Sequence, residues 1–316
     1  MPPFMASVWG QRTMLRGRLY TSFGGLYTIR MAMTYGDRFE ILPVGRGEHE
    51  AEQLRTPLHL TVTCSPKHGP DRTVEAAKRL RSLGHDVTPH VAARMVRDPS
   101  HLDALLGDLA EAGVDDLFLI GGDADSPQGL YTGAVDLLPL VDEHPLRPRA
   151  IGIAGYPEGH PLISDGELDR VLLEKSRLAD YVTTQMCFDP DAVRSWVMRQ
   201  RERGIALPVL IGTPGKVARR RLIDLSVRIG VGPSLAFVRK QRGLRSLIAR
   251  GSTADTLHDA LSPMRDDPEL NIAGFHYFTF NQLLETWRWQ LEKQSHKDLP
   301  TESAAGTYVH PEESTA

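Results

Sequence analysis

The chain has 316 residues, of which 41% are hydrophobic and 24% are charged, with a net charge of −3 and a pI of about 6.5. This length and apolar content suit one globular domain, and the near-neutral charge argues against nucleic acid or an anionic membrane as a partner. No stretch approaches the roughly 18 uninterrupted apolar residues of a membrane span. Cys64 and Cys187 are the only cysteines, which predicts no disulfide framework and a reduced, cytoplasmic setting.

The two ends of the chain differ in composition from the middle. Residues 1–36 contain no Asp or Glu but carry several arginines, which predicts an N-terminal extension. One interpretation is that the start codon is assigned too early and that the real protein begins near Met31 or Met33; the other is a transit peptide. Residues 293–316 are polar and are predicted to form a disordered tail. Residues 37–292 are then the folded domain.

Eight short apolar segments follow one another along this domain, and nearly every one ends on a polar or aromatic residue. They span residues 38–42, 58–63, 87–90, 117–123, 150–156, 181–185, 208–212 and 275–281. Apolar runs this short, separated by helical patterns, are typical of buried parallel strands in βα units. Eight units predict a closed (β/α)8 TIM barrel. The rival open sheet usually has G-x-G-x-x-G after its first strand, where this chain has Arg46-Gly47-Glu48.

Helical patterns separate the apolar segments. Residues 71–83 and 100–112 repeat apolar side chains with helical spacing and stop at Gly84 and Gly113. Asp98 before Pro99 predicts an N-cap with proline in the first turn. Helices are also predicted around residues 168–178 and over 192–203. Between residues 212 and 274 the chain is too long for one βα unit, which predicts extra helices over 217–229, 234–249 and 253–261 before the last strand.

The strand-end side chains are expected to surround one mouth, because parallel barrel strands end at the same rim. They are Glu40, Thr63, His90, Asp123, Tyr156 and Gln185. Glu40 has apolar neighbours, and a carboxyl group in an apolar setting can act as an acid, although a solvent-facing Glu is the alternative. Asp123 follows two glycines, which allow close approach to a ligand, although a turn is the alternative. No H-E-x-x-H or Cys/His cluster is present, so no metal is predicted.

Several motifs, in this order and at these strand ends, resemble a known family. They are Phe39-Glu40, Thr61-Val62-Thr63, Pro89-His90, Gly122-Asp123, Ala154-Gly155-Tyr156-Pro157-Glu158-Gly159-His160-Pro161, Glu174-Lys175, Thr184-Gln185-Met186-Cys187-Phe188-Asp189 and Phe275-His276-Tyr277-Phe278-Thr279-Phe280-Asn281. Each motif alone is weak, but the ordered set is specific. Over roughly residues 38–284 the chain resembles the methylenetetrahydrofolate reductase family.

The resemblance implies an oxidoreductase in which NAD(P)H reduces bound FAD and hydride then passes to 5,10-methylenetetrahydrofolate, giving 5-methyltetrahydrofolate. It implies that Glu40 is the general acid and that Asp123 stabilises the cationic intermediate. It implies folate contacts from Gln185, Phe278 and Gln282. The implied FAD contacts are Thr63, His90, Gly122, Asp123, Gly155, Tyr156, His160 and Lys175. The expected partner is a small-molecule folate, and a homo-oligomer is compatible with the sequence.

The chain departs from the family pattern at several of these places. Gly121 stands in place of an arginine, and Cys64 and Gly133 stand in place of tyrosines, which predicts weaker FAD binding. Phe278 and Gln282 stand where a tyrosine and an arginine are common. Two alternatives stay open: a flavin-free NAD(P)H-dependent reductase, and a divergent barrel that binds a folate or another one-carbon adduct without reducing it.

Overall fold

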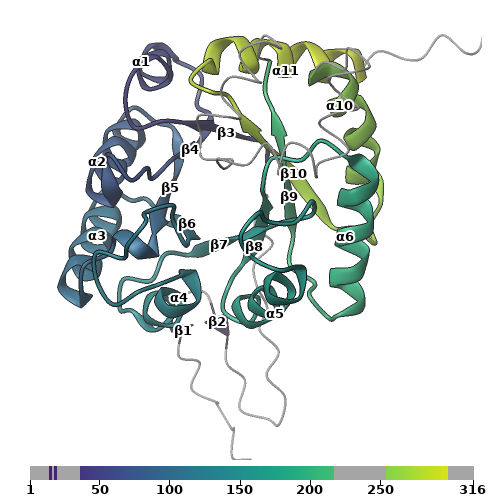
Figure 1. The fold of residues 1–316 in the computed structure, drawn as a ribbon. Coiled ribbons are helices and arrows are strands. Elements are labelled where there is room, and N and C mark those ends of the chain that lie inside the picture. Colours follow the sequence, from purple (N-terminus) through teal and green to yellow (C-terminus); the bar gives the residue numbers. More distant parts are fainter. Residues whose placement is uncertain (1–13, 16–17, 20–35, 217–253, 298–316) are drawn as a thin grey trace, which may run out of the picture.

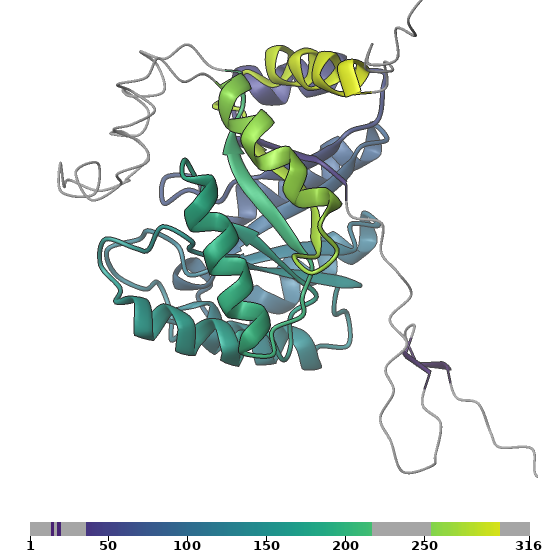
Figure 2. The same cartoon turned by 90° about the vertical axis from the view of Figure 1, so that its right-hand side faces the viewer.

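Eight parallel strands close into a barrel that is ringed by helices, as Figures 1 and 2 show for the computed structural model. The structure describes residues 14–15, 18–19, 36–216 and 254–297. The barrel strands are β3 (Arg38–Ile41), β4 (His59–Val62), β5 (Asp86–Ala92), β6 (Asp116–Ile120), β7 (Ala150–Gly155), β8 (Tyr181–Thr184), β9 (Val209–Pro214) and β10 (Ile272–Phe278). β10 pairs with both β9 and β3, which closes the sheet. The predicted TIM barrel is confirmed.

The strands lie where the apolar runs predict them, but their ends differ in ways that affect the site. β5 continues to Ala92, so His90 lies inside the strand and not at its end. β6 ends at Ile120, so Asp123 belongs to the following loop. β10 ends at Phe278, and Asn281, predicted to end that strand, instead has a φ of 61° in a turn. A short antiparallel pair, β1 (Met14–Leu15) with β2 (Arg18–Leu19), lies within the expected N-terminal extension.

The outer layer consists of helices that follow the strands. They are α1 (Arg46–Gln53), α2 (Gly69–Ser82), α3 (Pro99–Glu111), α4 (Ala134–Glu143), α5 (Asp165–Lys175), α6 (Pro190–Glu202), α10 (Ala254–Leu261) and α11 (Leu283–Lys297), with short 3-10 helices η1 (Ala93–Met95) and η2 (Ser262–Asp266). The helices α2, α3, α5, α6 and α10 were predicted, whereas α1, α4 and α11 were not. The helices predicted over 217–229 and 234–249 lie outside the described residues. α11 continues to Lys297, so the tail boundary expected at 293 falls inside a helix.

The sequence signals at the ends of α3 act as predicted. The Asp98 carboxylate accepts a hydrogen bond from the backbone N–H of His101 at 2.8 Å, and Pro99 occupies the first turn, where no intrahelical N–H bond is lost. Gly113 follows the helix with a φ of 68°, and Gly84 follows α2 with a φ of 95°. Both glycines adopt a left-handed conformation that side chains disfavour, so each ends its helix.

Successive side chains of β3 point alternately to the inside and the outside of the barrel. Phe39 stacks on Tyr277 with ring centroids 5.4 Å apart, and Tyr277 contacts Trp289 of α11, which places this layer under the helices. Arg38 points inward instead. Its guanidinium lies 2.9 Å from Asp116 and donates to the Tyr181 hydroxyl at 2.7 Å. Since these partners come from β6 and β8, Arg38 ties the strands together across the barrel interior.

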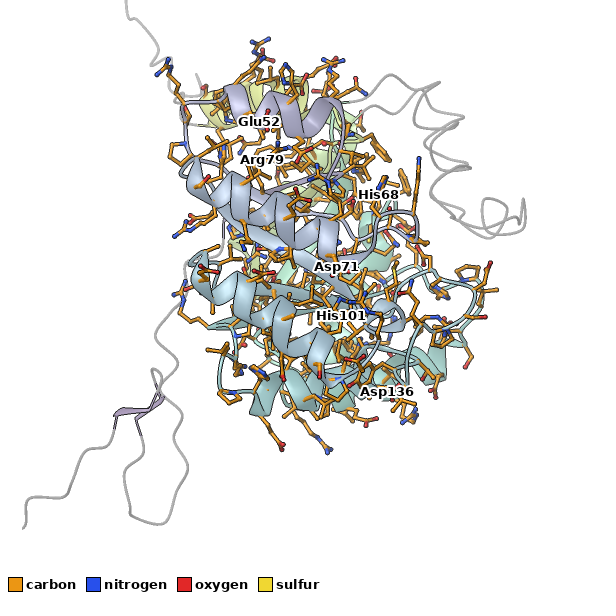
Figure 3. All side chains as sticks on the ribbon, turned by 90° about the vertical axis from the view of Figure 1, so that its left-hand side faces the viewer. Glu52, His68, Asp71, Arg79, His101 and Asp136 are labelled. Carbon is orange, nitrogen blue, oxygen red and sulfur yellow. The ribbon has the colours of Figure 1, made fainter. Side chains whose placement is uncertain are left out.

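Charged pairs join the outer helices to one another. Figure 3 shows the face formed by the first helices, where Arg79 of α2 pairs with Glu52 of α1 at 3.0 Å. His101 of α3 lies 3.1 Å from Asp71 of α2 on the same face. Arg79 also pairs with the buried Glu48 of α1. Within the described ranges, no helix combines the length and the apolar character needed to cross a membrane.

Candidate active site

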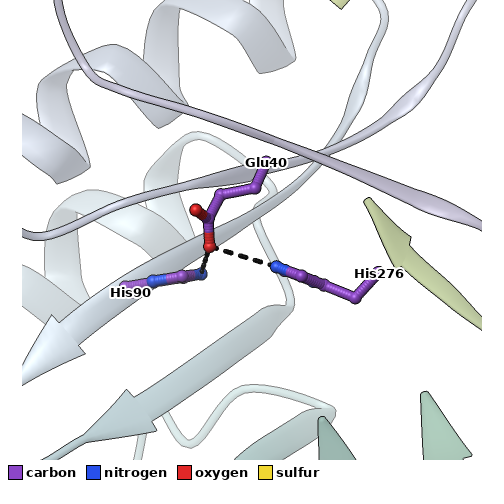
Figure 4. A group of neighbouring side chains, drawn as sticks. All are labelled: Glu40, His90 and His276. Carbon is purple, nitrogen blue, oxygen red and sulfur yellow. Dashed lines mark hydrogen bonds and ion pairs between the residues drawn. The ribbon is translucent and has the colours of Figure 1, made fainter. Parts of the chain in front are cut away.

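Three side chains meet just inside the barrel mouth: Glu40 of β3, His90 of β5 and His276 of β10 (Figure 4). The Glu40 Oε2 atom lies 3.1 Å from His276 Nε2 and 3.9 Å from His90 Nε2. Both imidazoles are buried, whereas the Glu40 side chain is 16% exposed. The carboxyl group therefore has a route to the mouth while one of its oxygens faces the two imidazole rings.

The two imidazoles are fixed by their surroundings. Phe118 packs edge-on against His90 with ring centroids 4.8 Å apart, and Phe278 packs in the same way against His276 at 4.9 Å. Burial lowers the pKa of His90 to about 4, with the nearby Glu40 charge acting in the opposite direction. His90 is therefore neutral at physiological pH and adds no full positive charge beside Glu40.

A second group lies on the loops after β6 and β7. Tyr156 and His160 meet edge to face with ring centroids 5.2 Å apart. Burial, together with the smaller effect of the Asp123 charge, raises the pKa of Tyr156 to about 12. Burial lowers the pKa of His160, and Asp123 partly offsets this effect. Asp123 is thus close enough to act on both rings, although its own side chain is exposed.

The other predicted folate contacts differ in accessibility. Gln185 is exposed, and its Oε1 accepts a hydrogen bond from the backbone N–H of Met186 at 2.8 Å, so the side chain is turned back onto its own loop. Phe278 is half-buried against His276 and so lies beside the Glu40 cluster. Gln282 is buried after the turn that follows β10, and its Nε2 has no hydrogen-bond partner among the described residues.

The predicted cofactor contacts include buried polar side chains as well as glycines. Thr63 Oγ1 and His90 Nε2 are buried polar atoms without a hydrogen-bond partner in the described part of the chain. Lys175, in the last turn of α5, is buried as well, and burial lowers its pKa to about 8. These atoms can satisfy a ligand that brings acceptors or negative charge.

The predicted glycines are accounted for by packing. A Cβ at Gly155 would lie 2.7 Å from the Trp196 ring of α6. A Cβ at Gly122 would lie 2.7 Å from the Cβ of Ala92, and Gly122 has a φ of 92°. Both positions therefore require glycine for the fold, whether or not a cofactor approaches them.

Sequence reasoning missed two residues of this region. His276 was quoted within a motif but given no role, because the strand periodicity does not reveal that its ring reaches Glu40 across the β10–β3 pair. Glu158 is the other, and its carboxylate accepts hydrogen bonds from the backbone N–H groups of Phe188 and Asp189 at 2.5 and 2.8 Å. The motif around Tyr156 thereby joins two adjacent loops of the mouth.

The donor set of Glu40, His90 and His276 also fits a metal ion. One ligand atom from each of these three side chains lies within 4.8 Å of the other two. Two imidazoles and a carboxylate are ligands that Zn²⁺ accepts. The absence of a metal, expected from the sequence motifs, stays a prediction.

Comparison with known proteins places this barrel in a family. The family model for methylenetetrahydrofolate reductase matches residues 49–214, just over half of the chain. The chain therefore belongs to the methylenetetrahydrofolate reductase family. Glu40 and His276 lie outside the matched segment, so their roles have to be argued from the geometry.

The similar proteins span more than this chain does. Methylenetetrahydrofolate reductase 1 of Schizosaccharomyces pombe is 31% identical over 121 residues, which cover 35% of this chain and 20% of the relative. Methylenetetrahydrofolate reductase 2 of Saccharomyces cerevisiae is 29% identical over 124 residues, which cover 36% of this chain and 21% of the relative. The aligned part thus represents about a fifth of each curated relative.

A solved structure supports the fold. An uncharacterized protein from Clostridium thermocellum that binds two copies of 5-methyl-5,6,7,8-tetrahydrofolic acid has a TM-score of 0.54 with this chain at 10% identity. The superposition covers 81% of this chain and 96% of that one.

Proposed function

We propose that this chain is an oxidoreductase that reduces 5,10-methylenetetrahydrofolate to 5-methyltetrahydrofolate with hydride from NAD(P)H. The observation that carries the proposal is the Glu40 carboxyl group at the barrel mouth, held by His276 at 3.1 Å in a chain of the methylenetetrahydrofolate reductase family. The Clostridium protein binds the product of this reaction on the same fold. Both cysteines are buried and free, which agrees with a reduced cytoplasmic compartment.

Glu40 is assigned the proton transfer. The five-membered ring of the substrate must open, so that the C–N bond to one nitrogen breaks and leaves an iminium ion on the other. Glu40 donates its proton to the leaving nitrogen, and hydride then adds to the iminium carbon to form the methyl group. His276 bonds the same carboxyl oxygen and fixes its direction. Burial lowers the pKa of His90 to about 4, so this neutral ring places no full positive charge beside the Glu40 carboxyl group.

Asp123 is assigned to the charge of the iminium ion. Its exposed carboxylate lies close to Tyr156 and His160 on the neighbouring loop. A fixed negative charge at this place favours the cationic intermediate over the neutral substrate. Gln185, Phe278 and Gln282 are proposed to contact the folate, although Gln185 must first release its bond to Met186.

The residues present fit FAD as the cofactor. Thr63 and His90 offer buried polar atoms without hydrogen-bond partners among the described residues, and Lys175 offers a buried cation for the diphosphate. The proposed FAD contacts are these three with Gly122, Asp123, Gly155, Tyr156 and His160. When bound, FAD supplies a hydride carrier between NAD(P)H and folate. Gly121, Cys64 and Gly133 remove groups that would add to its binding, so a loosely held cofactor is proposed.

The test measures 5-methyltetrahydrofolate formed from methylenetetrahydrofolate and NADH or NADPH, with and without added FAD. Glu40→Gln keeps the shape of the side chain and removes the acid, so turnover should fall at least about 10²-fold. Glu75→Gln, an exposed site on α2, is the matched control and should retain full activity.

Three other outcomes of this assay would count against parts of the proposal. Near-normal turnover by Glu40→Gln would refute its role as the acid. Folate binding without reduction would favour the binding barrel. NAD(P)H-dependent reduction by a protein that takes up no FAD would establish the flavin-free reductase.

A further inference from the structure

The loop that carries Asp123, residues 121–133 between β6 and α4, is held by one arginine from a different element. Arg94 belongs to η1, directly after β5. Its guanidinium donates hydrogen bonds to three carbonyl oxygens of the loop: to Ala124 at 2.8 Å from Nε, to Asp125 at 3.0 Å from Nη2 and to Thr132 at 3.2 Å from Nη1. Three bonds from one planar group fix both distance and orientation.

The backbone of Arg94 adds two further bonds to the same loop. Its N–H donates to the Gly121 carbonyl at 3.0 Å, and its own carbonyl accepts from the Gln128 N–H at 2.7 Å. The loop also lies directly on the segment around η1, since a Cβ at Gly129 would collide with the Arg97 carbonyl. Arg94 is therefore the centre around which the loop is wrapped.

The side chain of Asp123 has no such support of its own. Among the described residues, no hydrogen bond or ion pair holds its carboxylate, and it is exposed. Its position at the mouth is therefore set by the backbone on either side. Those neighbours, Gly121 and Ala124, are both bonded to Arg94. An exposed loop is ordinarily mobile, so these bonds decide how well Asp123 is placed.

We propose that Arg94 is a positioning residue that fixes the loop of residues 121–133 and thereby sets Asp123 at the mouth. The catalytic consequence rests on the proposed function, whereas the ordering of the loop does not. Arg94 does not act through charge alone. Its planar guanidinium donates from three separate nitrogens to three backbone carbonyls, a geometry that the single ammonium group of a lysine cannot reproduce.

The activity test is a double-mutant cycle of Arg94→Ala and Asp123→Asn, read as kcat and KM for folate reduction. If Arg94 acts through Asp123, each single variant loses about 10- to 10²-fold in kcat, and the double variant loses no more than the worse of the two. Additive losses would overturn the inference. Arg94→Lys should behave like Arg94→Ala. Arg97→Ala, a nearby half-exposed arginine that pairs with Asp71, is the control and should be unchanged.

A second measurement decides the inference without any substrate. Amide hydrogen exchange of residues 121–133 should be at least about tenfold faster in Arg94→Ala than in wild type or Arg97→Ala, at equal global stability. Should Arg94→Ala fail to fold, Arg94→Lys takes its place. Unchanged exchange in the loop refutes the inference. If the wild type neither binds nor reduces folate, the proposed function fails, and the exchange rates still decide the role of Arg94.

Discussion

Replacement of Lys175 gives the most direct test of the proposal that a buried positive charge binds the FAD diphosphate. Lys175 is 8% exposed, and its side-chain ammonium has neither a hydrogen-bond nor an ion-pair partner among the described residues. Burial lowers its pKa from the ordinary 10.5 to about 8. At about 1.4 kcal/mol for each pKa unit, a buried ammonium with this pKa lowers the free energy of unfolding by about 3 kcal/mol at pH 7.

Lys175→Met removes this cost and keeps an unbranched side chain of similar length, so it should raise the free energy of unfolding by about 3 kcal/mol at pH 7. The sign follows from proton binding. Between pH 8 and 10.5 the unfolded chain binds a proton that the folded chain has lost, so wild-type stability rises with pH in this window. The advantage of the variant should therefore shrink over the same window.

The assay is urea unfolding of the flavin-free protein at several pH values from 7 to 10. Lys67→Met, at an exposed loop position, is the matched control and should change stability little. The same Lys175→Met substitution should weaken FAD binding at least about tenfold, because the diphosphate loses a cation. A stability gain that is absent at pH 7, or that stays constant up to pH 10, would refute the reasoning.

Three further outcomes are expected. Asp123→Asn should lower folate turnover about tenfold or more without loss of stability, since the side chain is exposed. The same substitution should lower the pKa of His160 measured by NMR titration, and an unchanged pKa would show that the Asp123 charge does not act on His160. Protein purified without added flavin should be partly or wholly colourless and should regain flavin absorbance when titrated with FAD. Excess Zn²⁺ should inhibit reversibly by binding Glu40, His90 and His276, and the absence of any zinc-dependent inhibition would count against that geometry.

The barrel could be predicted from the sequence because its strands are short continuous apolar runs, a pattern that does not depend on distant residues. The missed helices lack such a pattern. The buried side of α1 includes Glu48, which pairs with Arg72 and Arg79 of α2, so apolar periodicity does not reveal it. α4 contains Pro139, which ordinarily argues against a helix interior.

The candidate site was predictable only in part, for a similar reason. Strand ends identify Glu40 and Asp123 as mouth residues, since every strand of a barrel ends at the same rim. They do not show which side chains reach across it. The bond from His276 to Glu40 joins residues 236 apart, and those from Arg94 depend on the path of an irregular loop. Such contacts are properties of the closed barrel and not of any local motif.

The ion pair inside the barrel has a consequence for how this sequence can change over evolutionary time. Arg38, Asp116 and Tyr181 are mutually bonded and almost fully buried. Loss of either Arg38 or Asp116 leaves the other as an unpaired buried charge, which typically costs about 3–5 kcal/mol, whereas joint replacement by apolar side chains of similar volume is often neutral. The three positions are therefore expected to change together. A single substitution between the buried polar set and an apolar replacement passes through a destabilised protein, so homologous barrels should carry either the whole polar set or an apolar one.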